Sequence, residues 1–141
     1  MMLSPILAVR DIDASAEFYV RAFGFHHNWT LPGSTGQADF ASVQIGKTEV
    51  FFGLVDGLEP PDAKTRRGAG ILLFIDLDKA AGLDIDFVYA RAQAAGAQIT
   101  RPLTDQEWGE RTFHCRDLDG YTLMFAQRIR AVAKAQAVPA A

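Results

Sequence analysis

Cysteine and clustered basic residues are scarce in this sequence. Cys115 is the single cysteine among 141 residues, so no disulfide can form within the chain. The 14 lysines and arginines are outnumbered by 17 aspartates and glutamates, and they form no long basic stripe. These features argue against a nucleic-acid partner and against binding to acidic lipid, because both interactions depend on concentrated positive charge.

Long apolar segments and a basic leader are also missing. Residues 1–5 contain neither a positively charged region nor an apolar run of the length that a signal peptide needs. We therefore expect a cytoplasmic protein that does not bind membranes. The composition, 49% hydrophobic and 22% charged, suits a globular chain of one domain or of two small modules that share a core.

Hydrophobic periodicity predicts the same order of elements twice: a strand, a helix and three strands. The first helix begins at Asp11 or Asp13 and ends at Gly24, and the second ends at Gly96. Tyr-Val-Arg-Ala from residue 19 recurs as Tyr-Ala-Arg-Ala from residue 89, at the same place in each helix. This repetition indicates an internal duplication. The predicted strands are 3–9, 25–31, 40–45, 48–54, 70–76, 98–103, 112–116 and 121–125, with Pro102 near the end of its strand.

The predicted fold class is α+β, with two tandem βαβββ modules. Their curved mixed sheets form a cleft, and one helix per module covers the outer face. The expected organisation is a first module at 1–54, an exposed connector at 55–69, a second module at 70–127 and an alanine-rich tail at 128–141.

Strand alternation gives each sheet one apolar side, packed toward the helices, and one mixed side. Cys115 falls on the packed side and is expected to act as a small buried hydrophobe. The other packed residues are Leu7, Val9, Val43, Ile45, Val50, Phe52, Ile71, Leu73, Ile75, Phe113, Leu123 and Phe125. The mixed side contains Ser4, Ile6, Ala8, Phe40, Ser42, Gln44, Glu49, Phe51, Leu72, Phe74, Thr112, His114, Thr122 and Met124. Aromatic rings among a few hydrogen-bonding groups are typical of a small-molecule pocket.

The last hairpin contains the most specific motif, Trp108-Gly109-x-Arg111-x-Phe113 followed by Asp117-x-Asp119-Gly120. Together with the duplicated order, the segment from Val9 to Asp13 and the Gly96-Ala97 helix end, it resembles the vicinal oxygen chelate superfamily over residues 3–127. This superfamily includes glyoxalase I, extradiol dioxygenases and bleomycin-resistance proteins, and the Trp-Gly-x-Arg pattern favours the last branch. Leu118 replaces the usual proline of the family, which should affect only the stiffness of the turn.

The resemblance implies a test for a metal centre. Enzymes of the family hold a divalent metal with His, Gln or Glu on the first and fourth strands of each module. In this sequence those positions fall at Ser4, Phe51, Gly70 and Met124, which are poor ligands for a hard metal ion. Glu49, two residues from Phe51, adds one carboxylate at most. We therefore expect no metal, no cofactor and no catalytic residue.

By resemblance, the predicted function is metal-independent binding and sequestration of a small molecule, as in resistance to glycopeptide antibiotics. A homodimer is implied, with or without exchange of modules between chains. The expected ligand-binding residues are Phe40, Phe51, Phe74, Trp108, Thr112, His114 and Met124.

Two alternatives stay open at this point. One is a lyase, isomerase or dioxygenase with a displaced metal site that uses Glu49, His114 or one of His26 and His27. The other is acid and base catalysis without a cofactor by His114 and Glu49. A packing role for Trp108 and a passive surface role for His114 are also consistent with the sequence.

Overall fold

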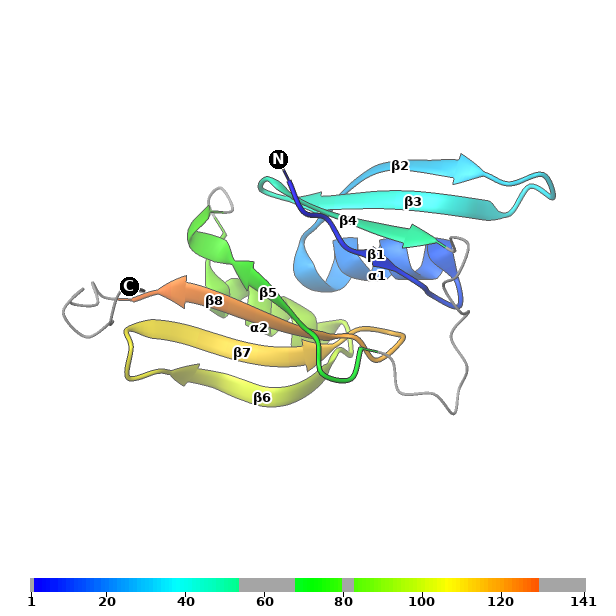
Figure 1. The fold of residues 1–141 in the computed structure, drawn as a ribbon. Helices are drawn as coiled ribbons and strands as arrows, with labels where there is room; N and C mark the ends of the chain where they lie inside the picture. Colours follow the sequence, from blue (N-terminus) through cyan, green and yellow to red (C-terminus); the bar gives the residue numbers. More distant parts are fainter. Residues whose placement is uncertain (1, 54–67, 80–82, 130–141) are drawn as a thin grey trace.

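The computed structural model describes residues 2–53, 68–79 and 83–129. Two four-stranded sheets and two α-helices make up this part of the chain (Figure 1). The elements are β1 (Ile6–Leu7), α1 (Ile12–Phe23), β2 (His26–Pro32), β3 (Ala38–Ile45), β4 (Thr48–Gly53), β5 (Leu72–Asp76), the 3-10 helix η1 (Leu77–Lys79), α2 (Ile85–Ala94), β6 (Gln98–Asp105), β7 (Glu110–Arg116) and β8 (Thr122–Arg128).

Both sheets have the same mixed topology. The first sheet has the order β1-β4-β3-β2 and the second the order β5-β8-β7-β6. The pairs β1–β4 and β5–β8 are parallel, and the other neighbours are antiparallel. The α+β class with two βαβββ modules is therefore confirmed. Most of the predicted connector, at 55–67, and most of the tail, at 130–141, lie outside the described residues.

Local capping explains where α1 begins and ends. The Asp11 carboxylate accepts a hydrogen bond from the Ala14 backbone N–H at 3.0 Å, which satisfies a free donor of the first turn. Gly24 ends the helix with a φ of 77°, a left-handed conformation that costs glycine little. Asp84 caps α2 in the same way, through the Asp86 N–H at 2.8 Å.

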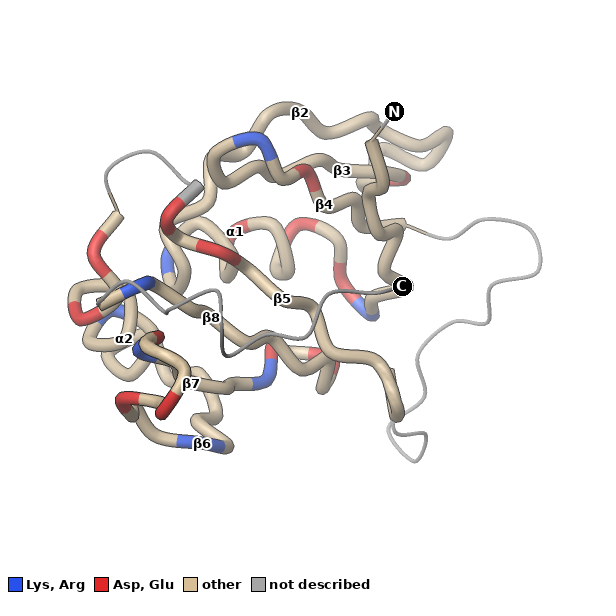
Figure 2. The backbone as a smooth tube through the Cα atoms, turned by 60° about the vertical axis from the view of Figure 1, so that its left-hand side comes forward, with Lys and Arg blue, Asp and Glu red and all other residues tan. Residues whose placement is uncertain are grey.

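The helix-facing sides of both sheets share one core. Figure 2 shows α1 between the strands of the first sheet and strands β5 and β8 of the second. Phe23, at the end of α1, contacts Phe125 of β8 with 5.3 Å between ring centroids, and Phe125 stacks on Phe113 at 5.0 Å. Cys115 lies fully buried in this core, as predicted. The sides of the sheets turned away from the helices, here called the open faces, therefore lie outside it.

The β7–β8 turn joins the two modules. The Asp117 carboxylate accepts hydrogen bonds from the Tyr19 hydroxyl at 2.7 Å and from the backbone N–H groups of residues 119 and 121. Asp119 accepts from Arg10 Nε at 3.0 Å and from the Ser15 hydroxyl at 3.4 Å. The two aspartates of the motif therefore connect the last hairpin to the start and middle of α1.

The structure differs from the sequence predictions at Ile71 and at Pro102. Ile71 was expected on the packed side, but it is 66% exposed. The reason is that β5 begins only at Leu72, so Ile71 lies outside the strand and follows a turn. Pro102 lies inside β6 and not near its end; it fits there because β6 is an edge strand with a register shift between Arg101 and Thr104.

Candidate functional site

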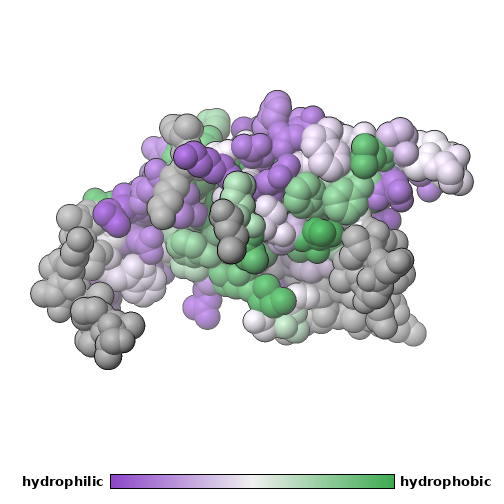
Figure 3. Space-filling model, turned by 45° about the horizontal axis from the view of Figure 1, so that its top comes forward, coloured by the Kyte–Doolittle hydropathy of each residue, from purple (hydrophilic) through white to green (hydrophobic). Residues whose placement is uncertain are grey.

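The open face of the first sheet contains a cluster of three aromatic rings. Trp29, Phe40 and Phe51, here called the ring cluster, have centroids 5.6 to 6.2 Å apart, and the Trp29 and Phe40 rings are stacked with 19° between their planes. Trp29 is 40% exposed and the two phenylalanines are partly exposed. In Figure 3 apolar side chains lie among hydrophilic ones on the face that is turned forward. The cluster thus offers solvent-accessible aromatic surface for a ligand.

A β-bulge places Trp29 in this cluster. Phe25 is buried on the helix side, so strict alternation along β2 would direct Trp29 to the same side. The pairing with β3 shifts between His27 and Trp29, and Trp29 then stands opposite Ser42, an open-face residue. Asn28 lies on the open face, as alternation from Phe25 gives, and its side-chain amide bonds to Ser42 there. Sequence alternation does not place Trp29 there, because nothing in the sequence marks the extra residue of a bulge.

Polar side chains lie beside the rings. Asn28, Ser42, Gln44 and Glu49, here called the Glu49 network, are joined through the Asn28 side-chain amide. It donates to Ser42 Oγ at 3.0 Å, to Gln44 Oε1 at 3.2 Å and to Glu49 Oε2 at 3.4 Å, and the Ser42 hydroxyl donates to the same carboxylate oxygen. Ser42 is buried and stands between Trp29 and Phe51 in the strand ladder. The network therefore borders the ring cluster directly.

On the second sheet, one row across the open face contains three predicted site residues. Phe74 of β5 pairs with Met124 of β8, and Met124 pairs with His114 of β7. Arg101 of β6 continues the row. Partial burial, and then the nearby positive charge of Arg101, lower the pKa of His114, so the imidazole is neutral at pH 7 and offers one donor and one acceptor.

Thr112 and Trp108 differ in accessibility. Thr112 is on the open face by register, but its side chain is buried and its hydroxyl accepts a hydrogen bond from Gln106 Nε2 at 2.9 Å. Trp108, in the β6–β7 turn, is 48% exposed, and its indole N–H donates to Glu110 at 2.8 Å. A ligand can reach the ring of Trp108, whereas the hydroxyl of Thr112 is buried and already bonded to Gln106.

The predicted site residues fall into two groups within one chain. Phe40 and Phe51 belong to the first sheet, and the other five belong to the second sheet or its β6–β7 turn. In Figure 1 the start of β3, where Phe40 lies, and the β6–β7 turn, which carries Trp108, are at opposite ends of the molecule. The single chain therefore does not bring all seven residues together, and a cleft lined by all of them stays a prediction.

A pocket of about 330 Å³ lies where the modules meet. Ile71, which is exposed and was expected in the core, lines this pocket. The lining residues are Pro5, Ile6, Leu7, Gly68, Ile71, Leu73, Tyr121 and Thr122. They come from the start of the chain, from β5 and its preceding turn, and from the start of β8, so both modules contribute to the pocket. Most of these side chains are apolar.

The residues at the metal positions implied by the family do not fit a metal ion. Phe51 has Ile6 as its neighbour on β1, and Met124 has Phe74 as its neighbour on β5. These side chains supply carbon and one thioether, whereas hard divalent ions bind oxygen and imidazole nitrogen. Within the described ranges, no three His, Cys, Asp or Glu side chains lie close enough to share an ion.

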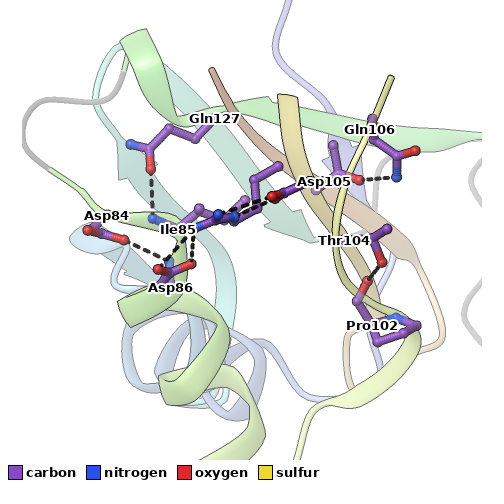
Figure 4. A network of polar contacts seen from close by, with 10 residues as sticks. Asp84, Ile85, Asp86, Pro102, Thr104, Asp105, Gln106 and Gln127 are labelled. Atoms are coloured by element: carbon purple, nitrogen blue, oxygen red, sulfur yellow. Dashed lines mark hydrogen bonds and ion pairs between the residues drawn. The ribbon is translucent and has the colours of Figure 1, made fainter. Parts of the chain in front are cut away.

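Arg111 of the Trp-Gly-x-Arg motif has a structural role. Its guanidinium donates to Asp105 on β6 at 2.6 Å and to both carboxylate oxygens of Asp86 on α2 at 3.1 Å. Figure 4 shows these two aspartates, with Gln127 bonded to the backbone N–H of Ile85 at the start of α2. Hydrogen bonds from Arg111 lower the pKa of Asp105. The arginine thus fixes α2 against the second sheet, on the side away from the open face.

These features define the class of the protein. The chain belongs to the Glyoxalase/Bleomycin resistance protein/Dioxygenase superfamily, whose family model matches residues 2–125. Along the described ranges, no helix is both long and apolar enough to cross a membrane.

Individual proteins are similar to this chain along most of their length. The chain is similar to TioX from Micromonospora sp. ML1, with 25% identity and a TM-score of 0.68 over 91% of this chain and 97% of that one. TnmS3, an antibiotic binding protein from Streptomyces sp. CB03234, has 21% identity and a TM-score of 0.65 over 91% and 95%. An uncharacterised protein of Mycobacterium tuberculosis is 28% identical over 134 residues, 92% of this chain and 76% of that protein.

Proposed function

We propose that this protein binds a flat or amphipathic small molecule and acts by sequestering it, without a metal and without converting it. The observation that carries the proposal is the partly exposed ring cluster beside the Glu49 network on the open face of the first sheet. Aromatic surface next to a few hydrogen-bonding groups suits the binding of such a ligand.

The family supports this proposal. Its name includes bleomycin-resistance proteins, and TnmS3, which has the same fold, is an antibiotic binding protein. An antibiotic is therefore the first ligand class to test, with resistance in the cytoplasm as the expected biological effect. Sequestration requires affinity and abundance only, so the lack of fit to a metal does not weaken it.

A homodimer is the second part of the proposal. The two groups of predicted site residues are separated within one chain, and a second copy could bring the first sheet of one chain to the second sheet of the other. Exposed apolar side chains on the open faces, such as Ile6, Leu72 and Phe74, favour burial against a partner. Sedimentation equilibrium should then give twice the chain mass of 15.4 kDa; a monomer at all concentrations would exclude this part.

Ligand binding is tested by titrating the protein with polycyclic aromatic compounds and with glycopeptides while tryptophan fluorescence is recorded. Phe51→Ala should weaken binding by about tenfold, because a buried aromatic contact contributes on the order of 1–2 kcal/mol. Phe87→Ala is the matched control, since Phe87 is 64% exposed on α2, and it should leave the affinity unchanged. Equal affinities of the two variants would contradict the proposed site.

Metal analysis of protein prepared without chelator tests the remaining part of the proposal, which is that the protein works without a metal. We expect no stoichiometric Fe, Mn, Ni or Zn. A metal that is bound at one per chain and lost in Glu49→Ala or His114→Ala would overturn metal-independent binding and favour an enzyme of the same superfamily.

A further inference from the structure

Glu49 is a partly buried carboxylate that forms no ion pair with any residue the structure describes. Its side chain lies on the open face at the start of β4 and receives hydrogen bonds from Asn28 and Ser42. No Lys, Arg or His in the part of the chain that the structure describes forms an ion pair with it. Removing a carboxylate from water without a counter-charge is unfavourable. The position therefore favours a cation from outside the chain.

One oxygen of this carboxylate remains available. Both hydrogen bonds to Glu49 end on Oε2, and within the described ranges Oε1 has no donor. The Asn28 amide and the buried Ser42 hydroxyl fix the orientation of the group. A carboxylate held in this way, with a free acceptor oxygen, is prepared to accept a charge-assisted hydrogen bond.

The ring cluster adds a second attraction for positive charge. The π faces of aromatic rings carry partial negative charge and attract ammonium and guanidinium groups. Ser42, which donates to Glu49, stands beside both Trp29 and Phe51 in the ladder. A Cβ at Gly53 would clash with the Phe40 ring, so the glycine allows that ring to lie over β4. Rings and carboxylate thus form one continuous surface.

From these observations, and resting on the function proposed above, we propose that the ligand is a cation. It carries an amine, ammonium or guanidinium group next to a flat ring system, with the rings stacked on Trp29, Phe40 and Phe51 and the positive group bonded to Glu49. A neutral ligand would leave the carboxylate without a counter-charge, and an anionic ligand would be repelled by it.

Three probes of the same shape and different charge test the inference by calorimetric titration at pH 7. Naphthylmethylamine is a cation, naphthylmethanol is neutral and naphthoate is an anion. We expect the affinity to fall in that order. Glu49→Gln keeps an acceptor for Ser42 and removes the charge, so it should weaken binding of the cation about tenfold and change binding of the neutral probe by less than about twofold.

Glu17→Gln is the matched control, because it makes the same change of charge at an exposed position on α1, and it should leave all three affinities unchanged. Circular dichroism confirms that the variants are folded. If the cation and the neutral probe bind equally, or if Glu49→Gln has no effect on the cation, the charge assignment is wrong while ring binding stands. If none of the three probes binds, both the charge assignment and the proposed function are wrong.

Discussion

The two sheets are alike on their helix sides and different on their open faces. On the helix sides both present buried aliphatic and aromatic residues to one core. On the open faces, corresponding rows across the strands carry different chemistry. The row of the first sheet is Ile6, Phe51, Ser42 and Trp29, and the row of the second is Phe74, Met124, His114 and Arg101.

This difference shows that the fold constrains the residues on the helix sides more than those on the open faces. The helix side must exclude water, so only apolar residues of suitable volume are accepted there. The open face has no such requirement, and the two halves have diverged on it. The first sheet offers rings and the Glu49 carboxylate, which forms no ion pair with any described residue, whereas the second offers a thioether, a neutral imidazole and a cation. Ligand specificity is therefore expected to reside on the open faces.

The largest expected effect is on stability, and it tests the contrast between the helix side and the open face of the second sheet. Phe125→Ala should lower the free energy of unfolding by about 3–5 kcal/mol, because the ring is fully buried between Phe23 and Phe113. Phe74→Ala, on the open face of the adjacent strand, should cost less than about 1 kcal/mol, since that ring is 52% exposed. Urea denaturation measures both. Equal losses would mean that the open face is as buried as the core.

The next largest effect is expected at the β7–β8 turn, which connects the second module to the first through Asp119. Asp119→Ala removes the acceptor of Arg10 and Ser15 and should cost about 2 kcal/mol, because the Asp119 side chain is almost fully buried. Asp13→Ala, an exposed carboxylate in the first turn of α1, is the control and should cost about 0.5 kcal/mol or less. A loss for Asp119→Ala no larger than the control would show that the turn does not join the modules.

A third effect depends on pH. Burial raises the pKa of Asp117 to about 6, although hydrogen bonds from Tyr19 and the backbone oppose the shift. The folded state thus holds this proton more tightly than the unfolded chain, whose pKa is near 3.8. Its contribution to stability is complete below pH 4 and is lost as the pH rises through 6, by about 3 kcal/mol at most.

Asp117→Asn tests this sign. The Asn oxygen can still accept from the two backbone N–H groups, while its amide donates to the Tyr19 oxygen. The stability of the variant relative to the wild type should increase between pH 4 and pH 7, as measured by urea denaturation at each pH. A difference that does not change with pH would place the pKa of Asp117 near its ordinary value.

The smallest effect is expected at His114 on the open face. His114→Gln should change the free energy of unfolding by less than about 0.5 kcal/mol, because the side chain is partly exposed and closes no core contact. Burial and Arg101 lower its pKa below 6.5, so unfolding is favoured as the imidazole gains a proton on acidification. NMR titration of the ring proton should give a midpoint below 6.5, and a midpoint above that value would contradict this environment.

The sequence predicted the helix sides well because their pattern is simple. Residues such as Val43, Phe52 and Leu123 alternate strictly and are all apolar, so period and hydropathy agree. The glycine that ends α1 and the aspartate that begins it were also readable, since each supplies a specific backbone contact.

The candidate site was only partly predictable. Trp29 reaches the open face through a bulge, which depends on pairing between strands and not on the local sequence. Thr112 is on the predicted face, yet Gln106 bonds to its hydroxyl from the preceding loop. The Glu49 network requires three strands in register. Sequence reasoning found the face, while the contacts on it come from tertiary structure.

The solitary thiol has a practical consequence. Burial raises the pKa of Cys115 to about 12, so in the folded protein almost no thiolate forms at neutral pH and alkylating reagents should find little to attack. Its position in the common core means that labelling requires the core to open. The rate of thiol modification in low denaturant would therefore report opening of the whole molecule, with no engineered probe, in a chain that contains no second cysteine.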